Sequence, residues 1–147
     1  MTKLLHTTAF LLCAAFTAPV MAQDYLEGLS AYIDDDFETA LENWRPLAEQ
    51  GHAAAQYNLG LMYTNGRGVP QDHAEAVRWY RMAAEQGHAR AQGYLGFMYT
   101  KGIGVPQDDA EAVRWYRMAA EQGDARAQSY LGLMYTNGRG VPQDHAE

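Results

Sequence analysis

The chain has 147 residues, which corresponds to at most one ordinary domain. Its 48% apolar and 20% charged residues can bury a core and argue against a disordered chain. The formal net charge of −7 argues against nucleic acid or an anionic membrane as the main partner, because phosphate groups are neutralised by Lys and Arg.

Residues 1–22 have the pattern of a secretory signal peptide. Lys3 supplies a positive start, residues 9–16 are apolar, and Val20 and Ala22 fit the small-x-small rule of a cleavage site. The apolar run is too short to span a membrane, which takes about 20 residues. We therefore predict cleavage after Ala22 and a periplasmic or secreted mature chain. That chain would lack Cys13, the only cysteine, and with it any disulfide or thiolate metal site.

A 36-residue unit is repeated through the remainder of the chain. Residues 51–86 and 87–122 are identical at 29 of 36 positions without a gap, and residues 123–147 match the first 25 positions of residues 51–86 at 21 places. A period of this length is typical of a solenoid. Residues 23–50 align as a divergent leading unit with a shorter turn, in which Pro46 is expected to kink or break the second helix.

The first helical pattern of each unit runs from about residue 53 to 63. Ala55, Leu59 and Met62 recur there at helix spacing. Gly60 recurs in every copy, which predicts that a neighbouring helix approaches closely. A single hairpin cannot bury its apolar face, whereas stacked units can. We therefore predict an all-α protein, a right-handed α/α solenoid of helix–turn–helix repeats.

The second helical pattern runs from about residue 73 to 85 and has a broad apolar face. Asp72 is expected to be its N-cap, with Glu75 as the capping-box partner. Gly87 is expected to be a left-handed C-cap.

The unit resembles the Sel1-like repeat, a relative of the tetratricopeptide repeat. Its Leu59-Gly60, Gly66-x-Gly68-Val69, Trp79-Tyr80 and Ala83-Ala84 elements carry this resemblance, which extends over residues 51–147. Residues 23–50 more resemble a tetratricopeptide-type hairpin that caps the array. The resemblance implies a non-catalytic scaffold of a bacterial envelope or secreted space, with a protein or peptide partner. The alternative is a weak β-lactamase-like hydrolase or cell-wall ligand binder, as in a cysteine-rich branch of the family.

No catalytic, cofactor or metal site is predicted. Ser30 and Ser129 lie in no nucleophile motif. His and Asp exchange at two repeat positions, 52/88/124 and 73/109/145, but each offers one ligand per unit, which disfavours a metal site. A capping role at the helix start is favoured instead.

The positions at which the copies differ form the candidate partner-binding surface. Positions 54, 58, 61 and 65 of the unit share one arc of the first helix, and first helices usually line the concave groove of such a solenoid. Arg and aromatic residues, which anchor interfaces, occur among them. The alternative is that exposed positions vary freely. The candidates are Asn58, Leu61, Arg90, Tyr94, Phe97, Lys101, Arg126, Tyr130 and Leu133.

The third unit, residues 123–147, has a first helix and cap signals but not the residues of a second helix. We therefore expect a truncated sequence. The face of Leu131, Met134 and Tyr135 would then be open and available for self-association.

Overall fold

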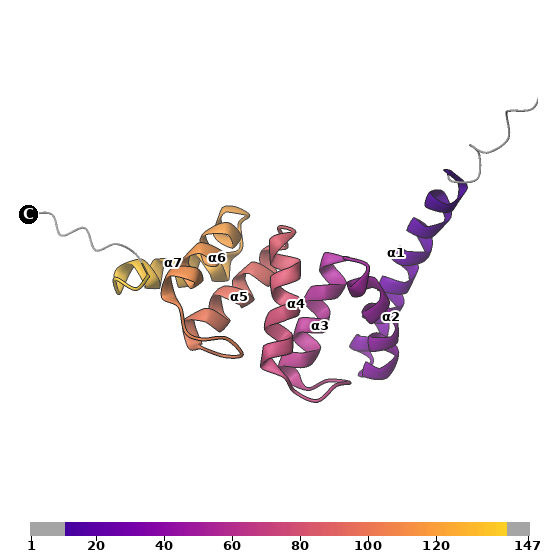
Figure 1. The fold of residues 1–147 in the computed structure, drawn as a ribbon, viewed down its shortest axis with the longest axis horizontal. Coiled ribbons are helices and arrows are strands. Elements are labelled where there is room, and N and C mark those ends of the chain that lie inside the picture. The colour runs from indigo at the N-terminus through magenta and orange to yellow at the C-terminus, as the bar shows by residue number, and fades with distance from the viewer. Residues whose placement is uncertain (1–10, 141–147) are drawn as a thin grey trace, which may run out of the picture.

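A computed structural model describes residues 11–140 of the chain, with side chains described from Met21 onward. Seven α-helices and no strand are found in this part (Figure 1). The helices are α1 (Leu11–Ile33), α2 (Phe37–Glu49), α3 (Ala53–Asn65), α4 (His73–Glu85), α5 (Ala89–Lys101), α6 (Asp109–Glu121) and α7 (Ala125–Thr136).

The helices stack in chain order along the long axis of the molecule (Figure 1). Helices α1–α2, α3–α4 and α5–α6 form hairpins, and each hairpin packs on the next through α2–α3, α4–α5 and α6–α7. This arrangement confirms the predicted all-α solenoid. The predicted second helix has the observed bounds of α4, whereas α3 ends two residues later than predicted.

The N-cap of α4 is confirmed, but its capping box is not. The Asp72 carboxylate accepts the N–H of Glu75 at 3.0 Å. Glu75 does not return a hydrogen bond to the cap; its carboxylate binds the guanidinium of Arg78, with Nε to Oε2 at 3.0 Å. The N–H of Asp72 instead donates to the Tyr63 carbonyl at 3.0 Å. A two-point bond to a guanidinium is charge-assisted, so it outcompetes the single bond to the backbone.

The C-terminus of α4 ends at a glycine as predicted. Gly87 has a φ of +87°, in the left-handed region. Its N–H donates to the carbonyl of Ala84, and the next N–H, of His88, donates to that of Ala83. These two bonds form a Schellman motif, which directs the chain into α5.

Pro46 does not break α2, so the expectation of a break is wrong. The helix continues to Glu49. Leu47 and Ala48, which follow the proline, are fully buried, as is Trp44 before it. Packing of this last turn on the core compensates for the hydrogen bond that proline cannot donate.

Close approach at the repeated glycine is confirmed. A Cβ on Gly96 would lie 2.8 Å from the Tyr116 ring, and Gly60 stands against Tyr80 in the same way. Gly28 faces Trp44 in the leading hairpin. The absence of a side chain thus gives an aromatic ring its place against the first helix. Gly132 has no such neighbour within 4 Å in the described part of the chain.

The edge formed by α7 is only partly open. Tyr135 is 47% exposed, as expected for an uncovered face, but Met134 is 4% exposed. Met134 belongs to a core cluster with Val113 and Tyr116 of α6, so the expectation that it lies open is wrong. Leu131 packs against the same cluster.

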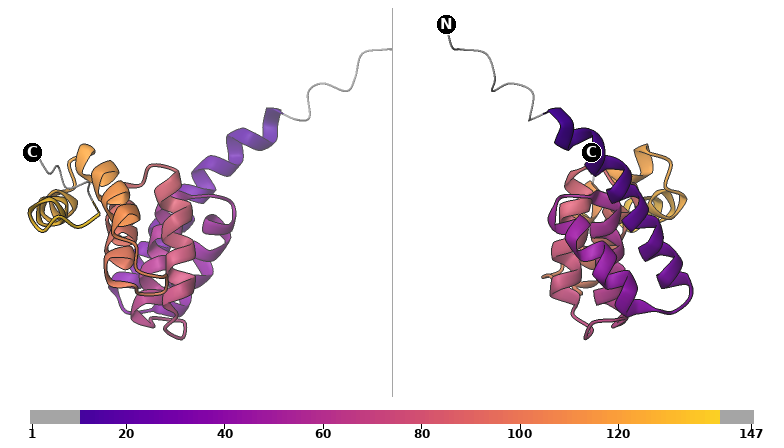
Figure 2. Two further views of the ribbon diagram at one scale, coloured as in Figure 1. Left: turned by 60° about the vertical axis from the view of Figure 1, so that its left-hand side comes forward. Right: turned by 90° about the vertical axis from the view of Figure 1, so that its right-hand side faces the viewer.

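Residues 1–10 of the predicted signal peptide lie outside the described residues. Residues 11–22 form the N-terminal part of α1, which projects away from the solenoid (Figure 2). The packing residues Tyr25, Ala31 and Tyr32 follow the predicted cleavage point, and Met21 precedes it. No helix within the described part combines the length and hydropathy needed to cross a membrane.

Candidate functional site

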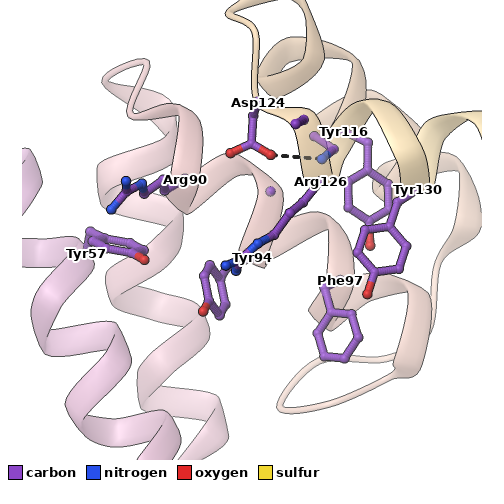
Figure 3. A pocket seen from close by; sticks show the side chains of 11 residues that line it. Tyr57, Arg90, Tyr94, Phe97, Tyr116, Asp124, Arg126 and Tyr130 are labelled. Atoms are coloured by element: carbon purple, nitrogen blue, oxygen red, sulfur yellow. Dashed lines mark hydrogen bonds between the residues drawn. The ribbon is translucent and has the colours of Figure 1, made fainter.

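A pocket of about 540 Å³ lies between α5 and α7 (Figure 3). This volume is within the range of small-molecule and side-chain binding sites. Its lining residues are Tyr57, Arg90, Gly93, Tyr94, Phe97, Tyr116, Asp124, Ala125, Arg126, Ala127 and Tyr130.

The aromatic walls of the pocket are fixed by stacking between units. The ring of Tyr94 stacks on Tyr80 with centroids 5.2 Å apart, and the ring of Tyr130 stacks on Tyr116 at 5.3 Å. The two pairs are copies of one another, 36 positions apart. Phe97 lies between units as well, 6.1 Å from the Tyr130 ring. The walls are therefore set by the repeat itself and need no ligand to form.

Two junctions between units are closed by a Tyr–His pair, tilted at the first and stacked at the second. At the leading junction the Tyr25 ring lies on His52, with centroids 5.0 Å apart. At the middle junction the Tyr57 ring stacks on His88 at 4.8 Å, and Tyr57 is only 9% exposed. In both cases the tyrosine comes from a first helix and the histidine from the start of the next first helix.

The third junction, here called the open junction, replaces both members of the pair. Gly93 stands where Tyr57 stands in the preceding unit, and Asp124 stands in place of His88. A Cβ on Gly93 would have one neighbour within 4 Å, the Asp124 Oδ1 at 3.9 Å. The pocket thus occupies the space that two rings fill at the middle junction.

At position 52/88/124 the exchanged His and Asp residues are helix caps. At the other exchanging position they are not, because His73 and Asp109 are the first residues of α4 and α6 and follow the capping aspartates. Nδ1 of His52 and of His88 accepts the N–H of the residue three positions on at 3.2 Å. Oδ1 of Asp124 accepts the N–H of Ala127 at 2.8 Å (Figure 3). This confirms the capping interpretation of that position. No cluster of three or more potential metal ligands occurs among the described residues.

Two arginines give the pocket its charge. Arg90 lies beside the Tyr57 ring, and Arg126 reaches from the start of α7 toward Tyr94 (Figure 3). Within residues 11–140, the ion pairs are made by Arg78, Arg114 and Arg139, and none involves the two pocket arginines. The only carboxylate in the lining is that of Asp124.

Burial controls the titration of the groups around the pocket. It raises the pKa of Tyr57 to about 12, with a further rise from the Tyr94 phenol, while the positive charges of Arg90 and Arg126 oppose the rise. Burial also raises the pKa of Tyr116 to about 12. The pKa of His88 is lowered by burial and by the charge of Arg90. At neutral pH the phenols are therefore protonated and His88 is neutral, as its capping bond requires.

The structure brings together five of the predicted partner-binding residues: Arg90, Tyr94, Phe97, Arg126 and Tyr130. It does not bring the others into the pocket. Asn58 is 8% exposed and its amide donates to the Tyr25 hydroxyl at 3.4 Å, because α1 covers this part of α3. Leu61 packs against a core cluster, and Lys101 and Leu133 are exposed outside the pocket lining.

The other residues of the lining were not among the candidates from the sequence; they are Tyr57, Gly93, Tyr116, Asp124, Ala125 and Ala127. The signal for Gly93 was available, since this position differs in every full or partial copy. Gly93 lies outside the predicted arc of the first helix, so it was not selected as a candidate. The signal for Asp124 was the His-to-Asp exchange. It indicates an open space only when Asp124 is known to lie next to Gly93 in the folded chain.

Comparison with known proteins gives a consistent result along the chain. The family model of the Sel1 repeat matches residues 21–52, 53–88, 89–124 and 125–147. A protective antigen of uropathogenic Escherichia coli with an SLR fold has a similar structure, with a TM-score of 0.79 and 44% identity over 85% of this chain and 28% of that one. A Sel1 repeat protein from Oxalobacter formigenes has a TM-score of 0.76 and 40% identity over 90% of this chain and 58% of that one.

Similarity that is lower or limited to a short segment extends to three other proteins. Cysteine-rich protein B of Helicobacter pylori shares the fold, with a TM-score of 0.60 and 19% identity over 76% of this chain and 95% of that one. An exopolysaccharide production negative regulator of Rhizobium leguminosarum is 41% identical over 35% of this chain, and a rat DAP3-binding cell death enhancer is 40% identical over 29%. The matched segments span only 19% and 8% of these two relatives.

Proposed function

The chain belongs to the Sel1 repeat family, and from this premise we propose that it is a non-catalytic scaffold that binds a protein or peptide. Sel1 repeat proteins are generally protein-interaction scaffolds. The surface proposed for binding is the concave helix-A surface, defined here as the face of α3, α5 and α7 that carries the pocket.

One observation carries this proposal: side chains from two consecutive units converge on a preformed pocket at the open junction. Arg90 and Tyr94 come from α5, and Arg126 and Tyr130 come from α7. Arginine and tyrosine in a partly enclosed site are the residue types that contribute most to interface free energy. The stacked walls are already in place, so little conformational entropy is lost on binding.

We test the scaffold function with crosslinking and pull-down from the native envelope. The variant Arg90→Glu/Lys101→Glu/Arg126→Glu reverses three exposed charges of the helix-A surface, while Arg78→Gln/Arg114→Gln changes exposed arginines on α4 and α6 as a matched control. We expect the first variant to lose the captured partner and the control to keep it, with equal far-UV circular dichroism. Equal capture by both variants would contradict the proposal.

We propose further that the chain acts in the periplasm or is secreted by a bacterium. The signal-peptide pattern of residues 1–22 supports this, as does the position of the packing residues of α1, which apart from Met21 follow the predicted cleavage point. N-terminal sequencing of the exported chain is expected to begin at Gln23. A chain that retains Met1 in every cell fraction would contradict this location.

Self-association is a further possibility that we propose for α7. Leu133 is 56% exposed and Tyr130, one helical turn before it, is 38% exposed, so α7 offers adjacent apolar side chains to a second copy. Sedimentation velocity of the purified chain tests this. We expect a dimer that dissociates in Leu133→Lys, and a monomer at all concentrations would contradict it.

A further inference from the structure

The two end helices of the solenoid carry its exposed apolar surface. Where side chains are described, the large apolar residues that are exposed all lie on α1 or α7, which stand at opposite ends of the stack (Figure 1). They are Leu26, Leu29 and Ile33 on α1, and Tyr130, Leu133 and Tyr135 on α7. Apolar side chains that adjoin one another on a surface indicate an interaction site, whereas isolated ones do not.

On α1 the exposed apolar side chains form one stripe, here called the α1 stripe. Leu26, Leu29 and Ile33 follow one another at i, i+3 and i+7, so they lie on one face of the helix. They are 57%, 37% and 71% exposed. The face that packs on α2 is a different one, where Gly28 lies against the ring of Trp44.

A stripe of equal length lies on α7. Tyr130 and Leu133 are one helical turn apart, and Arg126 precedes Tyr130 by one turn. From Arg126 to Leu133 the helix rises by about 10.5 Å, and the α1 stripe covers the same number of residues and therefore the same rise. The two surfaces match in length.

The same positions are covered in the unit that follows α1. Counted from the glycine that faces an aromatic ring of the second helix, Asn58 and Leu61 of α3 stand where Leu26 and Leu29 stand on α1. Asn58 is buried, and Leu61 packs against a core cluster. The exposed stripe is thus a property of the end helix and is not shared by every unit.

The two ends also differ in charge. Residues 23–36 contain five acidic residues and no basic one, whereas residues 125–140 contain two arginines and no acidic residue. The ion pairs in the described part of the chain include neither Arg126 nor any acidic residue of α1. Glu27 and Asp34, each next in sequence to a residue of the α1 stripe, are exposed. Charges of opposite sign on two surfaces favour their association.

We propose that α1 of one copy of the chain packs against α7 of a second copy. The α1 stripe contacts Tyr130 and Leu133, while Glu27 and Asp34 lie near Arg126 of the second copy. The contact joins two different surfaces and is therefore heterologous. Arg126 and Tyr130 also line the pocket, so a bound copy covers one of its walls. This inference rests on the self-association proposed for α7 and names the surface that α7 binds.

The test uses two variants that each change one of the surfaces. Leu26→Gln/Ile33→Gln changes α1, and Leu133→Gln changes α7. All three side chains are exposed, so we expect the far-UV circular dichroism of the natural chain in both variants. In sedimentation velocity the natural chain should associate as its concentration rises, and each variant alone should stay monomeric. An equimolar mixture of the two variants should form a dimer, because the intact α7 of the first binds the intact α1 of the second.

Charge reversal tests the polar part of the contact. Glu27→Arg/Asp34→Arg and Arg126→Glu should each weaken association, and the chain that carries all three changes should associate as the natural chain does. Glu85→Arg reverses an exposed acidic residue of α4 as a matched control and should leave association unchanged. Added salt should weaken association of the natural chain, because exposed charges are screened.

The proposal is overturned if either surface variant alone associates as the natural chain does. Association of the α1 variant would indicate contact between two α7 helices, and association of the α7 variant would indicate contact between two α1 helices. A mixture that stays monomeric, or charge reversals without effect, would also overturn it. A natural chain that is monomeric at all concentrations would remove the self-association proposed for α7 as well. The envelope capture experiment tests the scaffold function separately in each of these cases.

Discussion

The middle junction and the open junction share a backbone conformation at the helix cap, but side chains fill the first and leave a pocket at the second. At the middle junction Tyr57 stacks on His88 and the space between units is filled. At the open junction Gly93 and Asp124 leave a pocket of about 540 Å³. The cap of the following helix is kept in both, because His88 and Asp124 each accept the N–H of the residue three positions on.

The comparison shows how a repeat protein acquires a site without altering its fold. Truncating a buried aromatic side chain costs about 3–5 kcal/mol, and glycine within a helix costs about 1 kcal/mol relative to alanine. The open junction lacks the packing of the buried ring and has a glycine within the helix, so both effects lower its stability. In exchange it exposes the stacked Tyr94 and Tyr130 rings beside two arginines. A loss of packing of this size at a single position favours a role in binding over random variation.

The largest effect is expected from opening the middle junction. Tyr57→Gly/His88→Asp converts it into a copy of the open junction, and we expect the free energy of unfolding to fall by about 3–5 kcal/mol through loss of the buried ring. Urea denaturation followed by circular dichroism measures this. A fall of less than about 1 kcal/mol would mean that Tyr57 contributes little packing and that the two junctions do not differ as described.

Two glycines on α5 allow the effect of an added methyl group to be compared between a tightly packed position and an open one. A Cβ on Gly96 would meet the Tyr116 ring at 2.8 Å, whereas on Gly93 it would meet only Asp124 at 3.9 Å. We expect Gly96→Ala to cost about 1–3 kcal/mol through overpacking. Gly93→Ala should instead stabilise α5 by up to about 1 kcal/mol. The pair is its own control, since both substitutions add one methyl group to one helix, and equal effects would contradict the open geometry at Gly93.

The two caps should differ because only one of them also stacks. Asp124→Ala removes a cap and should cost about 1 kcal/mol. His88→Ala removes a cap and also the stacked contact with Tyr57, which adds about 0.5–1.5 kcal/mol. Thermal unfolding of both variants measures the difference. If Asp124→Ala is the more destabilising of the two, the Tyr57–His88 stack is not a stabilising feature of the middle junction.

The sequence was sufficient to predict the repeat architecture, because every unit repeats the same helix spacing and cap residues. Asp72 and Gly87 act as the local rules predict. The rules failed where a packing or side-chain contact that they do not include decided the outcome, at a distance for Pro46 and within one helical turn for Glu75. Pro46 is tolerated because the turn beyond it is buried on the core, and Glu75 leaves the cap because Arg78 is within reach.

The candidate site was predicted in part for a related reason. Position along one helix singled out Arg90 and Tyr94, which line the pocket. It also singled out Asn58, which α1 covers. Gly93 and Asp124 belong to different helices, and the space they leave exists only when two units are stacked. The spacing of residues along one helix therefore cannot predict a pocket that forms between two helices.

The smallest effect concerns pH and again separates the two junctions. Burial and the charge of Arg90 hold the pKa of His88 below its ordinary value of 6.5. Above pH 6.5 both the folded and the unfolded states carry a neutral His88, so its contribution to stability is fully present. As the pH falls below 6.5, the unfolded state takes up the proton first, and the free energy of unfolding decreases until the lowered folded-state pKa is passed.

His88→Asp removes this group, and its carboxylate stays ionised between pH 7.5 and 5.5. We therefore expect urea denaturation at these two pH values to show a larger loss of stability for the natural chain than for the variant. Equal losses would mean that protonation of His88 does not weaken the middle junction, since the two chains differ only at this residue.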